Sequence, residues 1–358
     1  MLFSRSGVVQ TQNNICFSGT VLNEVNVHKH LGIVLHNRLS WDNHISHIIE
    51  RVSNRINTLR RLQYLLPRNC LETVYKSMIR PIIEYGDVLF PGLSVMQSKR
   101  MEHIQRQVAL ICTKAYLRTP HTLLLNELGW EELSTRRKFH CLVVMFKIQN
   151  NFVPQYLTKL CPPARNQSTQ YNLRSHNDIS NIYCRYVSFR KTFFPFTINH
   201  WNGLDLDTRQ ITTVNHFKKT LGMSLLSKHH KLYSVFTGRA AINHTRLRLG
   251  LSALNAHRSH FNFIDVSNCP KCGAESESTA HFFFVCHAYA AQREELFTNV
   301  LTTTGLNHYI HRNQNVSRID MIAKVKFMLH GDTHLSFEEN CEIFKSVQKF
   351  ITDSHRFL

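Results

Sequence analysis

The chain has 358 residues, of which 43% are hydrophobic, so a disordered chain is excluded and two or three compact units with their own cores are expected. Lysine and arginine number 43 against 24 acidic residues, which gives a formal net charge of +19. This excess of positive charge favours a polyanionic partner, most commonly nucleic acid, with a basic protein that lacks such a partner as the alternative.

The cysteines indicate a reducing compartment. Of the ten cysteines, three belong to a metal-binding pattern described below, and the other seven lie mostly in apolar runs without paired spacing. The sequence shows neither the apolar core of a signal peptide nor an apolar run of membrane-spanning length. We therefore expect an intracellular protein with no membrane partner.

Residues 1–38 are predicted to form a small β-structure. Two β-favouring runs, residues 14–17 and 29–35, are interrupted or followed by glycines at positions 19 and 32. Glycine allows the left-handed backbone conformations that tight turns require.

Residues 39–160 are predicted to form a helical bundle. From Ser40 onward, apolar residues recur with helical spacing at Ile45, Ile48, Ile49, Val52, Ile56, Leu59 and Leu62. A second helical stretch follows Pro67 and should be kinked by Pro81, and a third begins at a capping box made of Ser94 and Gln97. A fourth runs from Trp130 to Ile148, and its centre is apolar on all sides, as expected for a helix buried in the bundle.

Basic residues lie off the apolar stripes of the first and third helices. They are Arg51, Arg55, Arg60, Arg61, Lys99, Arg100 and Arg106. For any single arginine, a solvated helix face is the simpler interpretation, but the same sign on successive helices indicates a phosphate-binding surface.

The remainder of the chain is divided into four parts. Residues 161–182 are polar and contain two consecutive prolines near their start, which is typical of a linker. Residues 183–235 are predicted to form an aromatic and basic connecting region. Aromatic side chains among basic ones can stack bases and hold phosphates, although core packing is their more common role. Residues 236–305 surround the metal-binding pattern, and residues 306–358 are predicted to contain two helices, the last with a capping box of Ser336 and Glu339.

The metal-binding pattern is C-x2-C-x8-H-x4-C, made of Cys269, Cys272, His281 and Cys286. Three thiolates and one imidazole are the donors that zinc prefers at the corners of a tetrahedron. Gly273 lets the chain turn after the first pair, and one short helix or turn can present both His281 and Cys286. Alternatives are His287 as the fourth ligand, a catalytic zinc with a water ligand, or unrelated buried cysteines. Four protein donors favour a closed, structural Zn²⁺ site.

Several segments of the chain resemble reverse transcriptases of non-LTR (LINE-type) retrotransposons. The similarity begins in residues 29–35 and 39–45, which read KHLGIVL and LSWDNHI, and continues through residues 75–86, 102–105, 136–137, 154–157, 201–204, 244–248 and the metal-binding stretch. It covers nearly the whole chain in a specific order.

The fold is expected to be mainly α, with a small β-structure at the N-terminus and a zinc-nucleated helical subdomain near the C-terminus. The resemblance implies roles for three parts of it. Residues 1–38 would be a β remnant of the palm, with Leu31 and Gly32 in a primer-grip-like position. The helices of residues 39–160 would be the thumb, which in this family lies along the primer-template duplex. The metal-binding stretch would be the C-terminal zinc knuckle, which helps to hold RNA template or target DNA.

The chain also departs from the family pattern. Polymerisation in this family needs a Phe/Tyr-x-Asp-Asp motif whose carboxylates hold Mg²⁺, and the sequence contains no Asp-Asp pair. No catalytic residue is therefore assigned, no other catalytic motif is present, and the chain is predicted not to polymerise DNA alone. Mg²⁺ is expected only if a catalytic palm is supplied by a missing polymerase portion.

The expected function is that of a nucleic-acid-binding C-terminal fragment of such a polymerase. RNA or DNA would be held by the basic thumb helices and by Arg246, Arg248, Lys271 and Arg293 around the zinc, within a nuclear or cytoplasmic ribonucleoprotein. A zinc-stabilised protein-interaction module and a non-functional product of a decayed element are the alternatives.

Overall fold

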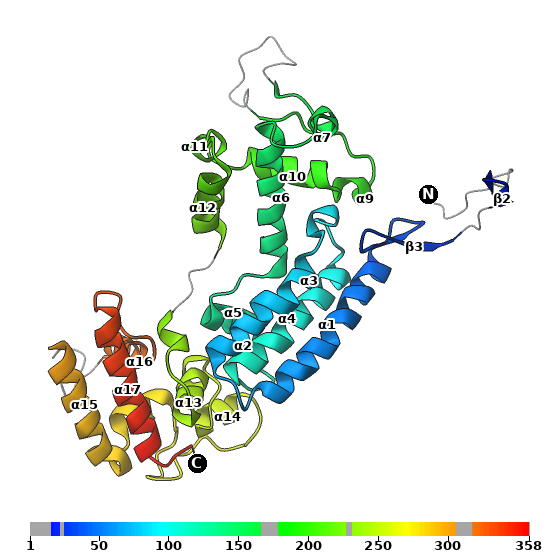
Figure 1. Ribbon diagram of the computed structural model, residues 1–358. Coiled ribbons are helices and arrows are strands. Elements are labelled where there is room, and N and C mark those ends of the chain that lie inside the picture. The colour runs from blue at the N-terminus through cyan, green and yellow to red at the C-terminus, as the bar shows by residue number, and fades with distance from the viewer. Residues whose placement is uncertain (1–15, 22–24, 166–177, 227–230, 306–316, 358) are drawn as a thin grey trace. The chain divides into compact units, whose positions relative to one another are not determined.

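A computed structural model describes residues 16–21, 25–165, 178–226, 231–305 and 317–357. The fold is mainly helical with two short antiparallel hairpins near its N-terminus, which confirms that the chain is mainly α (Figure 1). The chain forms two compact units. Unit 1 is Met1–Arg60, Thr73–Val108 and Trp130–Lys228, and unit 2 is Arg61–Glu72, Ala109–Gly129 and His229–Leu358.

The N-terminal strands form two separate hairpins, β1 (Cys16–Phe17) with β2 (Thr20–Val21), and β3 (Val27–His30) with β4 (Ile33–His36). The second hairpin turns through Leu31 and Gly32, whose φ angles are +47° and +83°. Positive φ at both central residues gives the backbone twist that suits a two-residue hairpin. The turn is fixed because the Tyr85 hydroxyl donates a hydrogen bond of 2.9 Å to the Leu31 carbonyl.

The first helices of unit 1 pack through apolar stripes. Most of α1 (Asp42–Leu62) and of α4 (Val95–Thr113) belongs to this unit, and the two helices run side by side (Figure 1). Their N-terminal ends are joined by a 2.9 Å hydrogen bond from Arg100 to the Ser46 hydroxyl. The predicted stripe of α1 is buried at Ile45, Ile48, Val52, Ile56 and Leu59, and the capping box of Ser94 and Gln97 is formed.

The helical run around Pro81, where a kink is expected, contains a π-helical segment. The helical run consists of α2 (Arg68–Val74), the π-helical η1 (Tyr75–Ile79) and α3 (Arg80–Glu84), followed by the 3-10 turn η2 (Asp87–Leu89). Pro81 is the second residue of α3 and follows η1 almost directly, so the π-helical segment lies next to the residue that cannot donate a helical hydrogen bond.

The rest of unit 1 is built around α6 (Leu133–Gln149). Helices α10 (Phe193–Asn202) and α12 (Val214–Leu225) pack on it, and Phe146 of α6 stacks on Phe217 with ring centroids 4.3 Å apart. The buried, all-apolar centre predicted for this helix is therefore confirmed. The short helices of this part are α7 (Gln155–Leu160), α9 (Val187–Arg190) and α11 (Leu206–Arg209).

Unit 2 has an aromatic core between its C-terminal helices. Helix α17 (Phe337–Asp353) packs against α13 (Arg239–Arg248), α15 (Ala290–Thr304) and α16 (Arg318–His330). Phe282 lies in the same core, with its ring centroid 5.0 Å from that of Phe350. The remaining elements are α5 (His121–Leu128), η3 (Lys231–Ser234), α14 (Asn255–His260), η4 (His281–Val285) and η5 (His287–Tyr289).

Both predicted C-terminal helices are present. Ser317 caps α16, and Ser336 forms with Glu339 the capping box expected at the start of α17. The predicted linker lies partly outside the described residues, and where it is described, Ala164 and Ile179 pair as a β-bridge. The boundary between residues 228 and 229 falls inside residues 183–235, which the sequence predicts to be one connecting region. In the described part of the chain, no helix has the length and apolar character needed to cross a membrane.

Replacing Phe146 with alanine should destabilise unit 1 by about 3–5 kcal/mol, because the side chain is fully buried against Phe217 and its loss leaves a cavity. The matched variant Phe152→Ala removes a ring that is 56% exposed and should change the free energy of unfolding by less than about 1 kcal/mol. Chemical unfolding followed by circular dichroism measures both. Equal effects of the two substitutions would contradict the assigned core.

Candidate metal centre and basic surfaces

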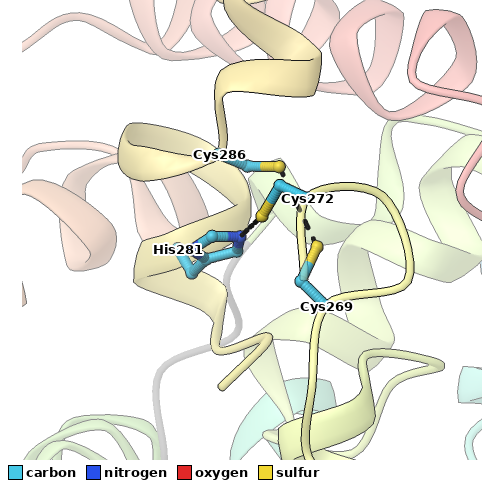
Figure 2. Close-up of side chains that lie close together, drawn as sticks. All are labelled: Cys269, Cys272, His281 and Cys286. Atoms are coloured by element: carbon cyan, nitrogen blue, oxygen red, sulfur yellow. Dashed lines mark hydrogen bonds between the residues drawn. The ribbon is translucent and has the colours of Figure 1, made fainter. Parts of the chain in front are cut away.

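Four potential metal ligands converge in unit 2. The donor atoms of Cys269, Cys272, His281 and Cys286 all lie within 4.8 Å of one another (Figure 2). The Cys269 and Cys286 sulfurs are 3.9 Å apart, and the Cys272 sulfur is 3.2 Å from Nε2 of His281. A tetrahedral ion with metal–sulfur bonds of about 2.3 Å needs donor separations of roughly 3.5–3.8 Å. The cluster could therefore hold a metal ion such as zinc.

A tight loop presents the first two cysteines. The Cys269 N–H donates to the Ala274 carbonyl at 2.8 Å, and the Gly273 N–H donates to the Cys269 carbonyl at 2.9 Å. Gly273 has a φ of +75°, a left-handed conformation that costs glycine little because it has no Cβ. The turn leaves Pro270 and Lys271 exposed between the two ligands.

A π-helical turn presents the other two ligands. The Cys286 N–H donates to the His281 carbonyl five residues earlier, at 2.8 Å, and this bond ends η4. The predicted short helix for this pair is thus confirmed, with a wider turn than an α-helix. Arg293 of α15 fixes the turn from behind, because its guanidinium donates to the carbonyls of Phe283 and Cys286.

The protonation tendencies of the ligands follow from burial and hydrogen bonding. Burial raises the pKa of the Cys286 thiol to about 12, whereas a hydrogen bond from the Ala274 backbone lowers the pKa of Cys272. Burial also lowers the pKa of His281, so its ring is neutral at neutral pH and Nε2 can act as a donor to a metal. A bound cation would favour thiolates at the three cysteines.

The donor set suits a structural metal ion. Four protein donors complete a tetrahedron, so this arrangement leaves no position for a reacting water. The alternative ligand His287 is exposed and is not among the four residues whose donor atoms converge. Five of the remaining cysteines are fully or partly buried, and Cys16 and Cys70 are exposed.

A buried ion pair ties the metal loop to the last described residues. Glu277 is completely buried and accepts hydrogen bonds of 2.5 and 2.6 Å from the Arg356 guanidinium. The Asn255 backbone N–H also donates to Glu277, at 2.7 Å. These two acidic and basic residues are 79 positions apart, so no local spacing in the sequence could indicate their pairing.

The predicted basic residues of α1 and α4 lie on exposed or half-buried surfaces. The exposed ones are Arg51, Arg55, Arg60, Arg61 and Lys99. Arg100 and Arg106 are half-buried. Lys99, His103 and Arg106 follow one another at four- and three-residue spacing, which places them on one face of α4, opposite the buried Met101, Ile104 and Val108.

The predicted basic residues around the metal have a different environment. Only Lys271 is exposed. Arg246 donates to the Lys114 carbonyl at 3.0 and 3.1 Å and lies over the Tyr116 ring, and Arg293 is only 5% exposed. Arg248 is paired with Glu127, and just 3% of its side chain is exposed. The expectation that Arg248 and Arg293 contact a nucleic-acid strand is therefore corrected, because their guanidinium groups are enclosed by protein acceptors.

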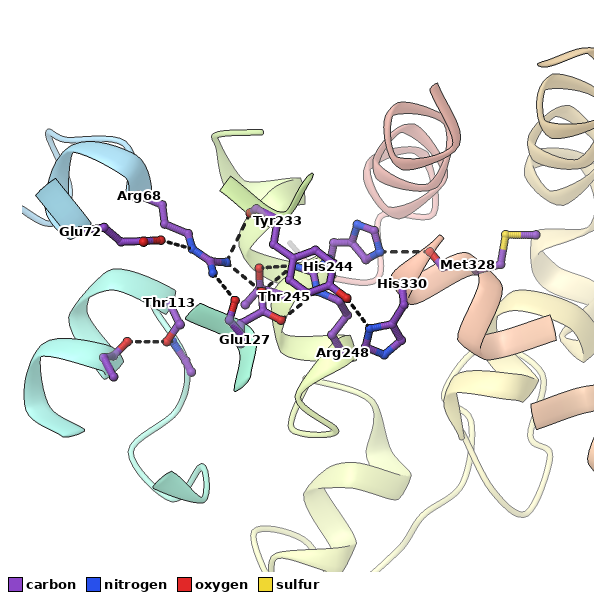
Figure 3. Close-up of polar contacts among 12 residues, drawn as sticks. Arg68, Glu72, Thr113, Glu127, Tyr233, His244, Thr245, Arg248, Met328 and His330 are labelled. Atoms are coloured by element: carbon purple, nitrogen blue, oxygen red, sulfur yellow. Dashed lines mark hydrogen bonds and ion pairs between the residues drawn. The ribbon is translucent and has the colours of Figure 1, made fainter. Parts of the chain in front are cut away.

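The partner of Arg248 belongs to a buried ionic cluster in unit 2 (Figure 3). Glu127 accepts hydrogen bonds of 2.8 Å from both Arg68 and Arg248, and Arg68 also donates to Glu72 at 3.1 Å. Arg248 additionally lies over the Tyr233 ring, 4.3 Å from its centroid. Burial alone would raise the pKa of Glu127, but attraction by Arg248 and Arg68 lowers it below the ordinary value.

Comparisons with models of protein families, with curated proteins and with solved structures gave no match to this chain.

Replacing Cys269 with serine should abolish stoichiometric metal binding and lower the melting temperature of unit 2, because one of four donors is lost. The control is Cys341→Ser, which removes a partly buried thiol outside the cluster. Metal analysis of the purified proteins should give one ion per chain for the parent and the control. Full occupancy in Cys269→Ser would contradict the assigned site.

Replacing Glu127 with glutamine should cost roughly 3–5 kcal/mol at neutral pH, because two arginines are left without their buried anion. The folded-state pKa of Glu127 is lowered, so its stabilisation is present above the ordinary value of 4.5 and is lost as the pH falls through the folded-state pKa. The stability difference between parent and variant should therefore shrink in acid. The control Glu294→Gln changes an exposed carboxylate, and an equal loss there would contradict the special role of Glu127.

Proposed function

We propose that this protein binds nucleic acid through the exposed cations of unit 1 and that its Cys3His cluster holds a structural zinc ion. The observation that carries the proposal is the distribution of charge on α1 and α4. Both helices bury an apolar stripe and keep their arginines and lysines at the surface. Such cations gain free energy by replacing the counterions of a phosphate backbone.

The two helices supply distinct contacts. Arg51 and Arg55 are four residues apart on one side of α1, and Lys99, His103 and Arg106 share one face of α4. Arg100 links the helices through Ser46, which holds this part of the surface in place before a ligand arrives. Pre-positioned cations lose less conformational entropy on binding than flexible ones do.

Zinc is the metal best suited to the cluster. Three soft thiolates and one imidazole disfavour magnesium and calcium, which prefer oxygen ligands. The ion would connect the loop at residues 269–274 to the π-turn of η4, and its role would be to hold these segments together. Lys271 at the exposed tip of the loop is then the one predicted cation near the metal that remains at the surface.

The resemblance to non-LTR retrotransposon reverse transcriptases adds a more specific form of this proposal. In that form α1 to α4 act as a thumb along a primer-template duplex, and the Leu31–Gly32 turn lies at the primer grip. The carboxylates that hold Mg²⁺ would come from a separate polymerase portion, since the sequence has no Asp-Asp pair. The function proposed here requires only the binding of nucleic acid.

The double variant Arg51→Gln, Arg55→Gln should weaken binding to duplex DNA and flatten its salt dependence. If both cations contact phosphates, the slope of log K against log salt should decrease by roughly 1.8, at about 0.9 per contact. Fluorescence anisotropy with a labelled duplex at several salt concentrations measures the slope.

The matched control Lys345→Gln, Lys349→Gln removes the same charge from exposed positions of α17. It should leave the slope of the parent nearly unchanged. A parent protein that binds neither RNA nor DNA, or binds with no dependence on salt, would contradict the proposal and favour a protein-interaction module.

A further inference from the structure

A groove in unit 1 has the features of a binding site for a planar ring. It encloses about 420 Å³, which is within the range of roughly 300–1,000 Å³ typical of small-molecule sites. Its apolar wall comes from Pro195 and Ile198 of α10, and Ile198 is only 1% exposed, so the wall is part of the packed core. The wall is therefore held in place by the core, and a flat ligand would contact mainly the exposed side chains that surround it.

Polar groups surround this apolar wall. Asn181 and Asn199 line the groove from opposite segments, and both residues are exposed. A side-chain amide offers two donors and one acceptor, which is the combination that base edges require. Arg190 of α9 also lines the groove and can supply a positive charge to a phosphate.

Exposed aromatic rings lie at and beside the groove. Tyr183 lines it with 87% of its surface exposed, and Tyr186 and Phe189 are 49% and 45% exposed. Rings that served only core packing would be buried, as Trp201 of the same region is. The guanidinium of Arg185 lies 5.6 Å from the centroid of the Tyr186 ring, so cations and rings are interleaved here.

The charge of this segment is of one sign. Residues 181–204 contain Arg185, Arg190 and Lys191 and no aspartate or glutamate. All three cations are exposed. An anionic ligand can therefore approach the groove without meeting a carboxylate of the same segment.

Two contacts position the groove. The side chain of Asn202 holds the Ile179 backbone through hydrogen bonds of 3.0 and 2.9 Å, which fixes the segment leading to Asn181 against α10. On the other side, a Cβ at Gly92 would lie 2.5 Å from Cβ of Lys191. The chain after α9 thus packs so closely on Gly92 that a larger residue would displace it.

We propose that this groove binds an unpaired base of a single-stranded nucleic acid, with Tyr183 stacking on the base and Arg190 contacting an adjacent phosphate. Bases in a duplex are stacked on their neighbours and cannot enter, so the groove selects single strands. The inference rests on the proposed function and adds to it the class of nucleic acid that unit 1 recognises.

The test uses the full chain and three labelled probes, which are oligo(dT), oligo(rU) and a duplex DNA of equal length. Tyr183→Ala should weaken binding to both single strands roughly 5- to 150-fold and change duplex binding less than about twofold. Tyr183→Phe keeps the ring and should retain the affinity of the parent. The control Tyr156→Ala removes another exposed tyrosine of unit 1, 65% exposed on α7, and should have no effect.

A second measurement examines the phosphate contact. Arg190→Gln should lower the salt slope for oligo(dT) by roughly 0.7, the value expected for one phosphate contact to a single strand. Comparison of oligo(dT) with oligo(rU) shows whether the groove distinguishes DNA from RNA, since these probes differ in the 2′-hydroxyl and in the C5 methyl of the base. Because Tyr183 and Arg190 are exposed, their variants should unfold at the melting temperature of the parent.

The outcomes separate the two proposals. If Tyr183→Ala binds single strands as the parent does, or loses duplex binding equally, this inference is overturned while the proposed function stands. If the parent binds none of the probes, both fail, and an acidic peptide becomes the better ligand class for the groove.

Discussion

Glu127 determines how unit 2 uses its arginines. A buried carboxylate is stable only when cations and hydrogen-bond donors surround it, and here Arg68 and Arg248 both turn inward to do so. The same principle operates at Glu277, whose buried carboxylate accepts a hydrogen bond from the Arg356 guanidinium. Arg246 and Arg293 instead donate hydrogen bonds to backbone carbonyls. Much of the positive charge near the metal therefore stabilises the fold, whereas Arg51, Arg55 and Lys99 on the helices of unit 1 remain exposed.

The metal cluster depends on two unusual pieces of backbone. A left-handed glycine closes the loop that carries Cys269 and Cys272, and a π-turn brings His281 and Cys286 together. The left-handed turn costs glycine little, whereas the π-turn is less favourable than a regular α-helix, and a metal ion that needs all four donors would offset that difference. Arg293, on the neighbouring helix, stabilises the π-turn whether or not an ion is bound.

Local features of the fold could be predicted from the sequence, and long-range ones could not. The stripe of α1, the capping boxes at Ser94 and Ser336, the apolar centre of α6 and the convergence of the four metal ligands all follow from spacing over a few residues. The pairing of Glu127 with Arg248 joins residues 121 positions apart, and no periodicity encodes it. For this reason Arg248 looked like a surface cation in the sequence. Arg293 did so because its partners are backbone carbonyls, which no residue type signals. The exposure of Tyr183 and its neighbours could likewise not be predicted from the sequence, because aromatic residues are more often buried.

The way the two units alternate along the chain has a consequence for synthesis on the ribosome. Every segment of unit 1 precedes residue 229, whereas unit 2 needs the stretch that follows it. Arg68 and Glu127 therefore leave the exit tunnel well before Arg248, which is 121 residues after Glu127. At about 5–20 residues per second this wait lasts roughly 6–24 s. Unit 1 can complete its folding during that interval. The early segments of unit 2, Arg61–Glu72 and Ala109–Gly129, still lack their partners from the C-terminal part of the chain and remain accessible to chaperones.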